Sequence, residues 1–144
     1  MDKKEIKIIT FGQYFAGWID SPDATNERKN NAERLMLAVA KLMDMLELAG
    51  VNFPVNDNTH SQVSGCTFGG FRPGNCCQGS NHSAHKEGLA VDIYDPHGYI
   101  DDYLMLHQDT LVECGLYMEH PDSTKGWCHL GLRAPASGKR VFCP

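Results

Sequence analysis

An apolar stripe at helical spacing runs through residues 30–50, formed by Leu35, Val39, Leu42 and Leu46. A helix with such a stripe packs that side against a hydrophobic core. Asn30 followed by Glu33 resembles a capping box at the start of the helix, and Gly50 is a suitable residue for its end. The pattern therefore predicts a core-facing helix between residues 30 and 50.

Residues 51–79 are rich in Gly, Asn, Pro and Ser, which predicts a long passage with little regular structure. Long loops in compact domains often carry function. The pattern then changes to strict alternation over residues 89–94, where Leu89, Val91 and Ile93 alternate with Ala90, Asp92 and Tyr94. This period is typical of a strand with one face on the core, so we expect Asp92 to point away from the aliphatic core.

The C-terminal third predicts a second helix over residues 98–115, with Gly115 at its end. Two strand-like runs follow, "LYMEH" and "WCHLGLR", separated by a turn-rich segment, and they predict a hairpin-like pair. On the second run Trp127, His129 and Gly131 share one face. Together these elements predict one α+β domain spanning residues 1–144, with helices packed on an antiparallel sheet.

The composition fits this expectation, because 144 residues with 42% hydrophobic and 22% charged content are typical of one globular domain. A net charge of -5 argues against a nucleic-acid partner. No apolar run approaches the roughly 18 residues of a membrane-spanning helix, and the short "IKIITF" is not the core of a signal peptide. We therefore expect no membrane insertion, and a monomer by default.

Six cysteines could form disulfides in a secreted chain: Cys66, Cys76, Cys77, Cys114, Cys128 and Cys143. Without an export signal, reduced thiols are the better expectation. Two alternatives stay open for the first three cysteines, namely a disulfide or, with His60 or His82, a structural zinc site. Their spacing matches no standard zinc pattern.

Candidate chemistry lies in "SNHSAHKEGLAVDIYDPHG", where His85 and Asp92 flank a loop-to-strand transition, and in the later strand that carries His129. Two imidazoles and one carboxylate, with a fourth position left to water, are the ligand set of a catalytic zinc site. The chain has seven histidines, so solvated histidines are the alternative to a metal site at this point.

A wider pattern supports the metal site. "SAHKEGLAVDI" fits S-x-H-x-x-G-x-A-x-D-[IL] and "WCH" fits W-x-H, and together they resemble the zinc peptidases of the D-alanyl-D-alanine carboxypeptidase and L-alanyl-D-glutamate endopeptidase family, which cut peptidoglycan stem peptides. "SGCTFGGFRPGN" is similar to that family's S-G-[YFW]-R-[SP] segment with an insertion. The opening "FGQYFAGW" and the tail, residues 115–144, resemble a branch common among bacteriophages and prophages.

The resemblance implies a hedgehog-like or D-Ala-D-Ala peptidase-like fold, in which Zn²⁺ is bound by His85, Asp92 and His129. It also implies that Ser83 helps to present His85 and lies at the substrate. Arg72 would bind a substrate carboxylate, because its planar fork matches a carboxylate bidentately. The alternative for Arg72 is an ion pair with a structural aspartate.

The chain departs from the family pattern at the catalytic acid or base. Many members have Glu three residues before the last histidine, or His two residues before it, but this chain has Gly126 and Trp127 there. The candidates that can move a proton are Glu119, His120 and Asp122. The phage-type branch often has Glu at the first of these positions, so Glu119 is preferred.

The expected function is hydrolysis of a peptidoglycan stem peptide next to a D-amino acid, by a zinc-dependent carboxypeptidase or endopeptidase of the endolysin or virion-associated type. The expected location is the cytoplasm of the producing cell or the virion, with action on the cell wall. The alternative is a catalytically inactive zinc-binding module, either a virion structural module or a cell-wall-binding one. The missing acid or base at the usual positions motivates this alternative.

Overall fold

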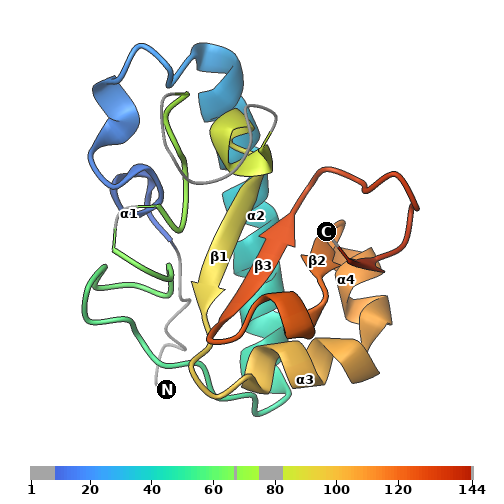
Figure 1. The fold of residues 1–144 in the computed structure, drawn as a ribbon. Helices are drawn as coiled ribbons and strands as arrows, with labels where there is room; N and C mark the ends of the chain where they lie inside the picture. The colour runs from blue at the N-terminus through green and yellow to red at the C-terminus, as the bar shows by residue number, and fades with distance from the viewer. Residues whose placement is uncertain (1–8, 67, 75–82, 144) are drawn as a thin grey trace.

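The computed structural model describes residues 9–66, 68–74 and 83–143. Its helices and strands follow one another along the chain (Figure 1). They are α1 (Phe11–Phe15), η1 (Trp18–Asp20), α2 (Asn26–Leu48), η2 (Ala84–Glu87), β1 (Ala90–Tyr94), α3 (Tyr99–Leu106), α4 (Gln108–Cys114), β2 (Tyr117–Glu119), η3 (Pro121–Ser123), β3 (Trp127–Gly131) and β4 (Val141–Phe142). This arrangement confirms the predicted α+β class.

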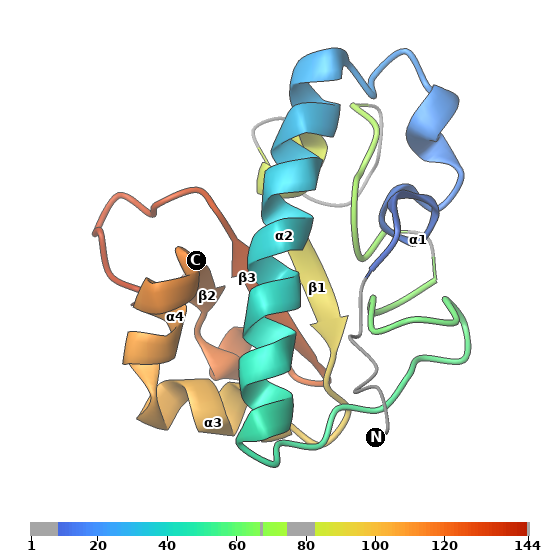
Figure 2. The ribbon, with the colours of Figure 1, turned by 180° about the vertical axis from the view of Figure 1, so that it is seen from behind.

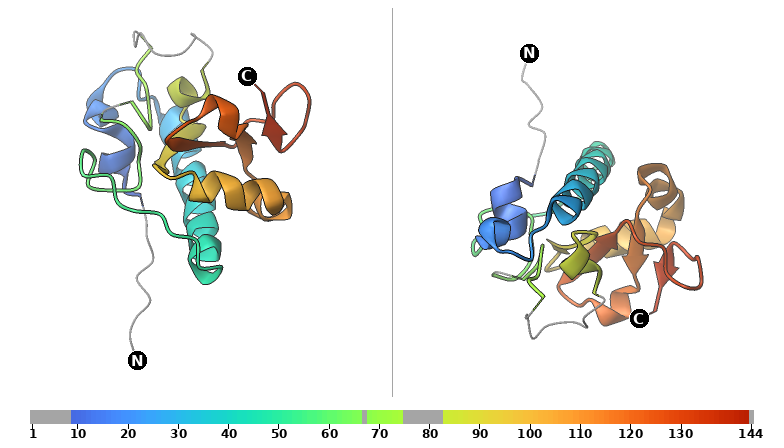
Figure 3. Two further views of the ribbon diagram at one scale, coloured as in Figure 1. Left: turned by 60° about the horizontal axis from the view of Figure 1, so that its bottom comes forward. Right: turned by 90° about the horizontal axis from the view of Figure 1, so that it is seen from above.

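The four strands form one sheet in the order β1-β3-β2-β4. β3 pairs antiparallel with both β1 and β2, which confirms the predicted hairpin-like pair. The predicted antiparallel pairing holds for β1, β3 and β2, but β4 pairs parallel to β2, so the sheet is mixed. The chain reaches β4 through residues 132–140, which project from the body of the domain in Figures 1 and 3. A hedgehog-like fold stays a prediction.

The long helix α2 covers one face of the sheet, and Figure 2 shows it in front of β1 and β3 when the molecule is viewed from behind. The predicted stripe is buried, with Leu35, Val39, Leu42 and Leu46 each at most 2% exposed. The helix begins earlier than the predicted Asn30, since the Thr25 hydroxyl accepts a hydrogen bond from the Arg28 backbone N–H and caps it. The polar first turns hid this start from the apolar pattern.

Residues 98–115 form two helices, so the prediction of one continuous helix is wrong. His107 leaves the helical conformation with φ -131° and ψ 57°, and it separates α3 from α4. Leu104 and Leu111 are nevertheless both fully buried. The apolar spacing therefore identified the core residues correctly but could not detect the break between them.

The sequence predicted reduced cysteines and no membrane-spanning helix. Cys66, Cys114, Cys128 and Cys143 are free thiols. The alternatives that involve Cys76, Cys77 or His82 lie outside the described residues. Among the residues that are described, no helix has both the length and the apolar character needed to cross a membrane.

A pair of buried acids lies where β1 leads into α3. The Asp95 carboxylate accepts hydrogen bonds from the backbone N–H groups of Ile100 and Asp101, which stabilises the first turn of α3. Asp101 is 3% exposed, and its Oδ1 has no hydrogen-bond partner among the described residues. Burial raises the pKa of Asp101 to about 7; a hydrogen bond from Cys128 opposes this rise, and the charge of Asp95 adds to it.

Because the buried Asp101 carboxyl has a raised pKa, we expect the protein to lose stability as the pH rises. The folded state holds the Asp101 proton up to about pH 7, whereas the unfolded state releases it near its ordinary pKa of about 4. Between these values the free energy of unfolding should fall by about 2 to 4 kcal/mol. Asp101→Asn should remove this fall, as measured by urea denaturation at pH 4.5 and pH 8 with chelator present.

Asp102→Asn is the matched control, because Asp102 lies on the same turn of α3 but is exposed. This variant should keep the pH dependence of the natural protein. Equal pH dependence in Asp101→Asn and the natural protein would show that Asp101 is not the group that titrates.

Candidate metal centre

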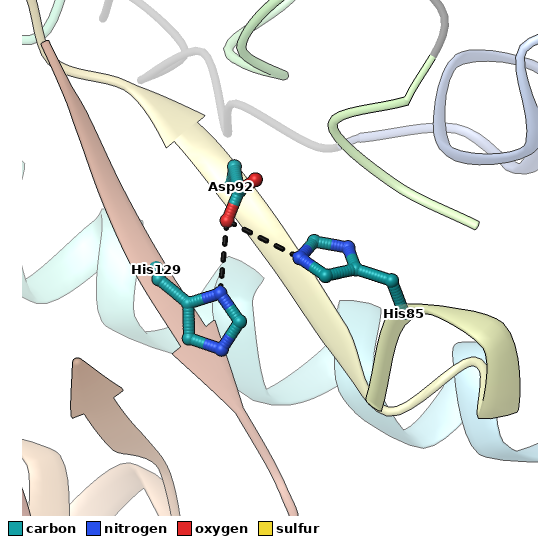
Figure 4. Close-up of side chains that lie close together, drawn as sticks. All are labelled: His85, Asp92 and His129. Carbon is teal, nitrogen blue, oxygen red and sulfur yellow. Dashed lines mark hydrogen bonds and ion pairs between the residues drawn. The ribbon is translucent and has the colours of Figure 1, made fainter. Parts of the chain in front are cut away.

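Three elements bring His85, Asp92 and His129 together on the face of the sheet opposite α2 (Figure 4). His85 lies on η2, Asp92 on β1 and His129 on β3. The Asp92 Oδ1 atom lies 3.3 Å from His85 Nε2 and 2.9 Å from His129 Nδ1. One potential ligand atom from each residue lies within 4.8 Å of the others, so this group could hold a metal ion.

The pairing of β1 with β3 sets the contact between Asp92 and His129. These two residues are direct partners in the antiparallel register. Side chains of directly opposed residues project from the same face with their Cβ atoms about 5 Å apart. A shift of one residue in either strand would turn one of the two side chains to the core, so the register itself specifies this half of the site.

The short helix η2 presents the third side chain. Gly88 ends η2 in the left-handed region with φ +72° and donates its backbone N–H to the carbonyl of His85. A Cβ atom at this position would lie 2.4 Å from the Arg28 carbonyl oxygen on α2. Only glycine therefore allows η2 to pack this closely on α2 while its chain turns directly into β1.

The orientation of the His85 ring depends on a backbone carbonyl. His85 Nδ1 lies 2.8 Å from the carbonyl oxygen of Gly70. A carbonyl can only accept, so Nδ1 carries the proton and donates it to Gly70, with Nε2 left facing Asp92. This hydrogen bond to a carbonyl is the supporting contact commonly found behind metal-binding histidines.

The loop that supplies this carbonyl packs tightly against α1. The Phe71 backbone N–H donates to the Tyr14 carbonyl at 3.0 Å, and a Cβ atom on Gly70 would lie 2.1 Å from that same oxygen. The Tyr14 hydroxyl in turn donates to the Ala90 carbonyl at the start of β1. The "FGGFR" segment therefore needs its glycine at position 70 to bring the carbonyl to His85.

Charge at the centre is concentrated on Asp92. Burial by itself raises the pKa of this carboxyl, but the charge of His85 and hydrogen bonds from His129 and His85 outweigh burial and hold the pKa well below its usual range. The second oxygen, Oδ2, lies 3.4 Å from Arg72 Nη2, and Arg72 Nε donates to the Phe68 carbonyl. Asp92 is therefore ionised and Arg72 is ion-paired with it, as the sequence-based alternative for Arg72 proposed.

Two of the three ligand separations fit a tetrahedral metal ion. Ligands about 2.1 Å from such an ion lie about 3.4 Å from one another. The two distances from Asp92 Oδ1, 3.3 Å and 2.9 Å, are close to this separation. Three protein ligands would leave one position of a tetrahedral ion for water or substrate.

Glu119 also lies at the centre, on β2 next to β3. Its Oε2 atom is 3.8 Å from His129 Nδ1. Burial raises the pKa of Glu119; the charge of His129 opposes this rise, and the charge of Asp92 adds to it. A carboxyl with a raised pKa beside an open coordination position is suited to exchanging protons with a bound water.

The other two candidates for the acid or base lie further along the chain toward the surface. The His120 Nδ1 atom accepts a hydrogen bond from the Asp122 backbone N–H, and the Asp122 side chain is 91% exposed. Neither makes a described contact with His85, Asp92 or His129 comparable to that of Glu119. Of the three candidates, the structure brings Glu119 to the ligands.

Comparisons of this chain with protein-family models, curated proteins and solved structures found no match. The resemblance to zinc peptidases stays a prediction from the sequence motifs.

Two cavities border the centre. Cavity A, about 360 Å³, has a lining that includes Ser64, Cys66, Phe68, Arg72, Asp92 and Trp127. Cavity B, about 250 Å³, has a lining that includes Ser83, His129, Gly131, Ala134, Pro135 and Phe142. The predicted substrate-binding residues therefore lie in different cavities, Arg72 in cavity A and Ser83 in cavity B.

Sequence reasoning missed two supports of the centre. One is the Gly70 carbonyl, which only the double glycine of "FGGFR" could have suggested. The other is Phe142 on β4, whose ring lies edge-on to His129 with centroids 6.3 Å apart. Phe142 also pairs in register with Glu119, so β4 holds the strand that carries this carboxyl.

The contact between the Gly70 carbonyl and His85 predicts that metal binding depends on the loop around Gly70. Gly70→Ala should weaken binding of a divalent metal by at least about tenfold, because the added Cβ displaces the carbonyl that orients His85, and loss of such support typically costs 10 to 100-fold in affinity. The affinity can be measured by competition of the protein with a chromophoric chelator for Zn²⁺.

Gly74→Ala is the matched control, since its Cβ atom would make only ordinary contacts, with the nearest atom 3.5 Å away. This variant should bind the metal as the natural protein does. Unchanged affinity in Gly70→Ala would contradict the supporting role of the Gly70 carbonyl.

Proposed function

We propose that the protein is a zinc-dependent peptidase that hydrolyses peptidoglycan stem peptides next to a D-amino acid. One observation carries the proposal: His85, Asp92 and His129 converge as a group that could hold a metal ion, and Glu119 lies 3.8 Å from His129. The motifs around these residues and the phage-like tail support a role as a wall enzyme of a phage or prophage.

The donor set favours zinc over the other common metal ions. Calcium and magnesium prefer sites built from oxygen ligands, whereas two imidazoles with one carboxylate suit zinc. Three protein ligands are also typical of catalytic zinc sites, while structural zinc sites use four. The same donors could bind other transition ions, so metal content distinguishes among them.

The chemistry follows from the residues around the ion. When bound, zinc polarises a peptide carbonyl and lowers the pKa of water. Glu119 is positioned to accept a proton from the attacking water and to pass it to the leaving amine. Its partly buried environment raises its pKa, which makes the carboxylate a stronger proton acceptor.

Arg72 has two roles in this proposal. Its Nη2 atom pairs with the Asp92 carboxylate, which fixes the orientation of that ligand. The same guanidinium lines cavity A, where its charge would attract a carboxylate of the stem peptide. The ion pair with Asp92 and the binding of substrate are compatible, because a guanidinium carries five N–H donors.

The inactive zinc-binding module is the second candidate. It was motivated by the absence of an acid or base at Gly126 and Trp127. The proximity of Glu119 to His129 weakens that reason, because a carboxyl from the neighbouring strand can serve as the acid or base in place of those two residues. Turnover therefore separates the two candidates, since both predict metal binding.

Glu119→Gln should abolish most of the activity and retain the metal. The amide keeps the size of the side chain but cannot accept a proton, and loss of a general base typically costs 10² to 10⁴-fold in rate. We expect kcat on purified wall fragments to fall by at least about 100-fold, with an unchanged zinc content. Cleavage is followed by mass spectrometry of the released peptides.

Glu113→Gln is the control for a carboxyl-to-amide change, because Glu113 is exposed on α4. A large loss of activity in His120→Ala or Asp122→Asn, with Glu119→Gln active, would overturn the assignment of the base. If the natural protein binds zinc stoichiometrically but releases no peptide, the inactive module is correct.

A further inference from the structure

The two cavities lie toward opposite ends of the face of β3 that carries Trp127, His129 and Gly131. Trp127 lines cavity A and Gly131 lines cavity B, and His129 lies between them on the same face of the strand. Asp92, the partner of His129 in the register, lines cavity A, while His129 itself lines cavity B. The candidate metal centre therefore separates the two cavities.

The length of this face matches a short peptide. Four residue steps along β3 from Trp127 to Gly131 span about 13 Å. An extended peptide of about four residues covers the same distance. With the centre in the middle, about two substrate residues would lie on each side of the bond that is cleaved.

We propose that cavities A and B form one continuous substrate groove, and that the protein is an endopeptidase that cleaves within a peptide bound on both sides of the metal. This inference rests on the proposed function. A carboxypeptidase needs space for only a single residue beyond the cleaved bond, and its cleft is closed behind that residue. Here both sides of the centre offer a cavity of at least 250 Å³.

The two cavities differ in chemistry, which gives the groove a direction. Cavity A combines Arg72 and Asp92 with the rings of Phe68 and Trp127, so it suits a part of the peptide that bears a carboxylate. Cavity B is bordered mainly by small or apolar residues, including Gly131, Ala134, Pro135 and Phe142, with Arg133 as the one arginine of its described lining. It suits a small apolar side chain such as that of alanine.

The test compares two synthetic stem peptides with the zinc-loaded protein. One peptide has a free C-terminus ending in D-Ala-D-Ala, and the other is acetylated at its N-terminus and extended at its C-terminus by several glycines, so that neither end is free. The endopeptidase predicts cleavage of the extended peptide at an internal bond, at least as fast as cleavage of the free one. Products are identified by mass spectrometry.

A variant tests whether cavity B belongs to the groove. Ala134→Trp should fill cavity B and raise KM for the extended peptide by about tenfold or more, with zinc content unchanged. Ala136→Trp is the matched control, because Ala136 is exposed on the same loop and does not line cavity B. Its KM should equal that of the natural protein.

The outcomes separate the continuous groove from the proposed peptidase activity. Internal cleavage of the extended peptide, with the KM effect confined to Ala134→Trp, supports the groove. Release of the terminal D-Ala from the free peptide alone, with the extended peptide intact, overturns the groove and leaves the proposed peptidase standing. Equal KM in both tryptophan variants removes cavity B from the groove. Absence of cleavage of either peptide overturns the peptidase and the groove together.

Discussion

Moving a carboxylate out of water is costly unless donors or cations face it, and Asp92 meets that requirement from three directions. His129 contacts it across the β1–β3 pair, His85 approaches from η2, and Arg72 pairs with its second oxygen. Each partner is held by a different part of the fold. The strand register, the turn at Gly88 and the glycine loop at Gly70 are therefore all needed to bring partners to one buried charge.

The apolar pattern predicted much of the scaffold, because burial leaves a direct periodic signal. The stripe of α2 and the alternation of β1 both fall where the structure has them. Boundaries were less predictable: the cap at Thr25 and the break at His107 depend on local backbone geometry that hydrophobic spacing does not encode. The parallel pairing of β4 is a contact between distant segments, which no local pattern could indicate.

For the candidate site too, local patterns predicted the candidate metal ligands, whereas the fold separates the candidates for proton transfer. The alternation of residues 89–94 predicted that Asp92 would leave the aliphatic core, and the sequence motifs grouped it with His85 and His129. The proton-transfer group was ambiguous along the chain because Glu119, His120 and Asp122 are near neighbours. Strand direction separates them, since β2 places Glu119 beside β3 before the chain turns away into η3.

Anomalous diffraction at the zinc edge from crystals grown with Zn²⁺ shows whether His85, Asp92 and His129 together bind zinc. We expect one strong peak bonded to His85 Nε2, an Asp92 oxygen and His129 Nδ1, at distances of about 2.0 to 2.2 Å. We also expect the Glu119 carboxyl within hydrogen-bond reach of the fourth ligand. A peak at the cysteines, or no peak at these three residues, would contradict this assignment.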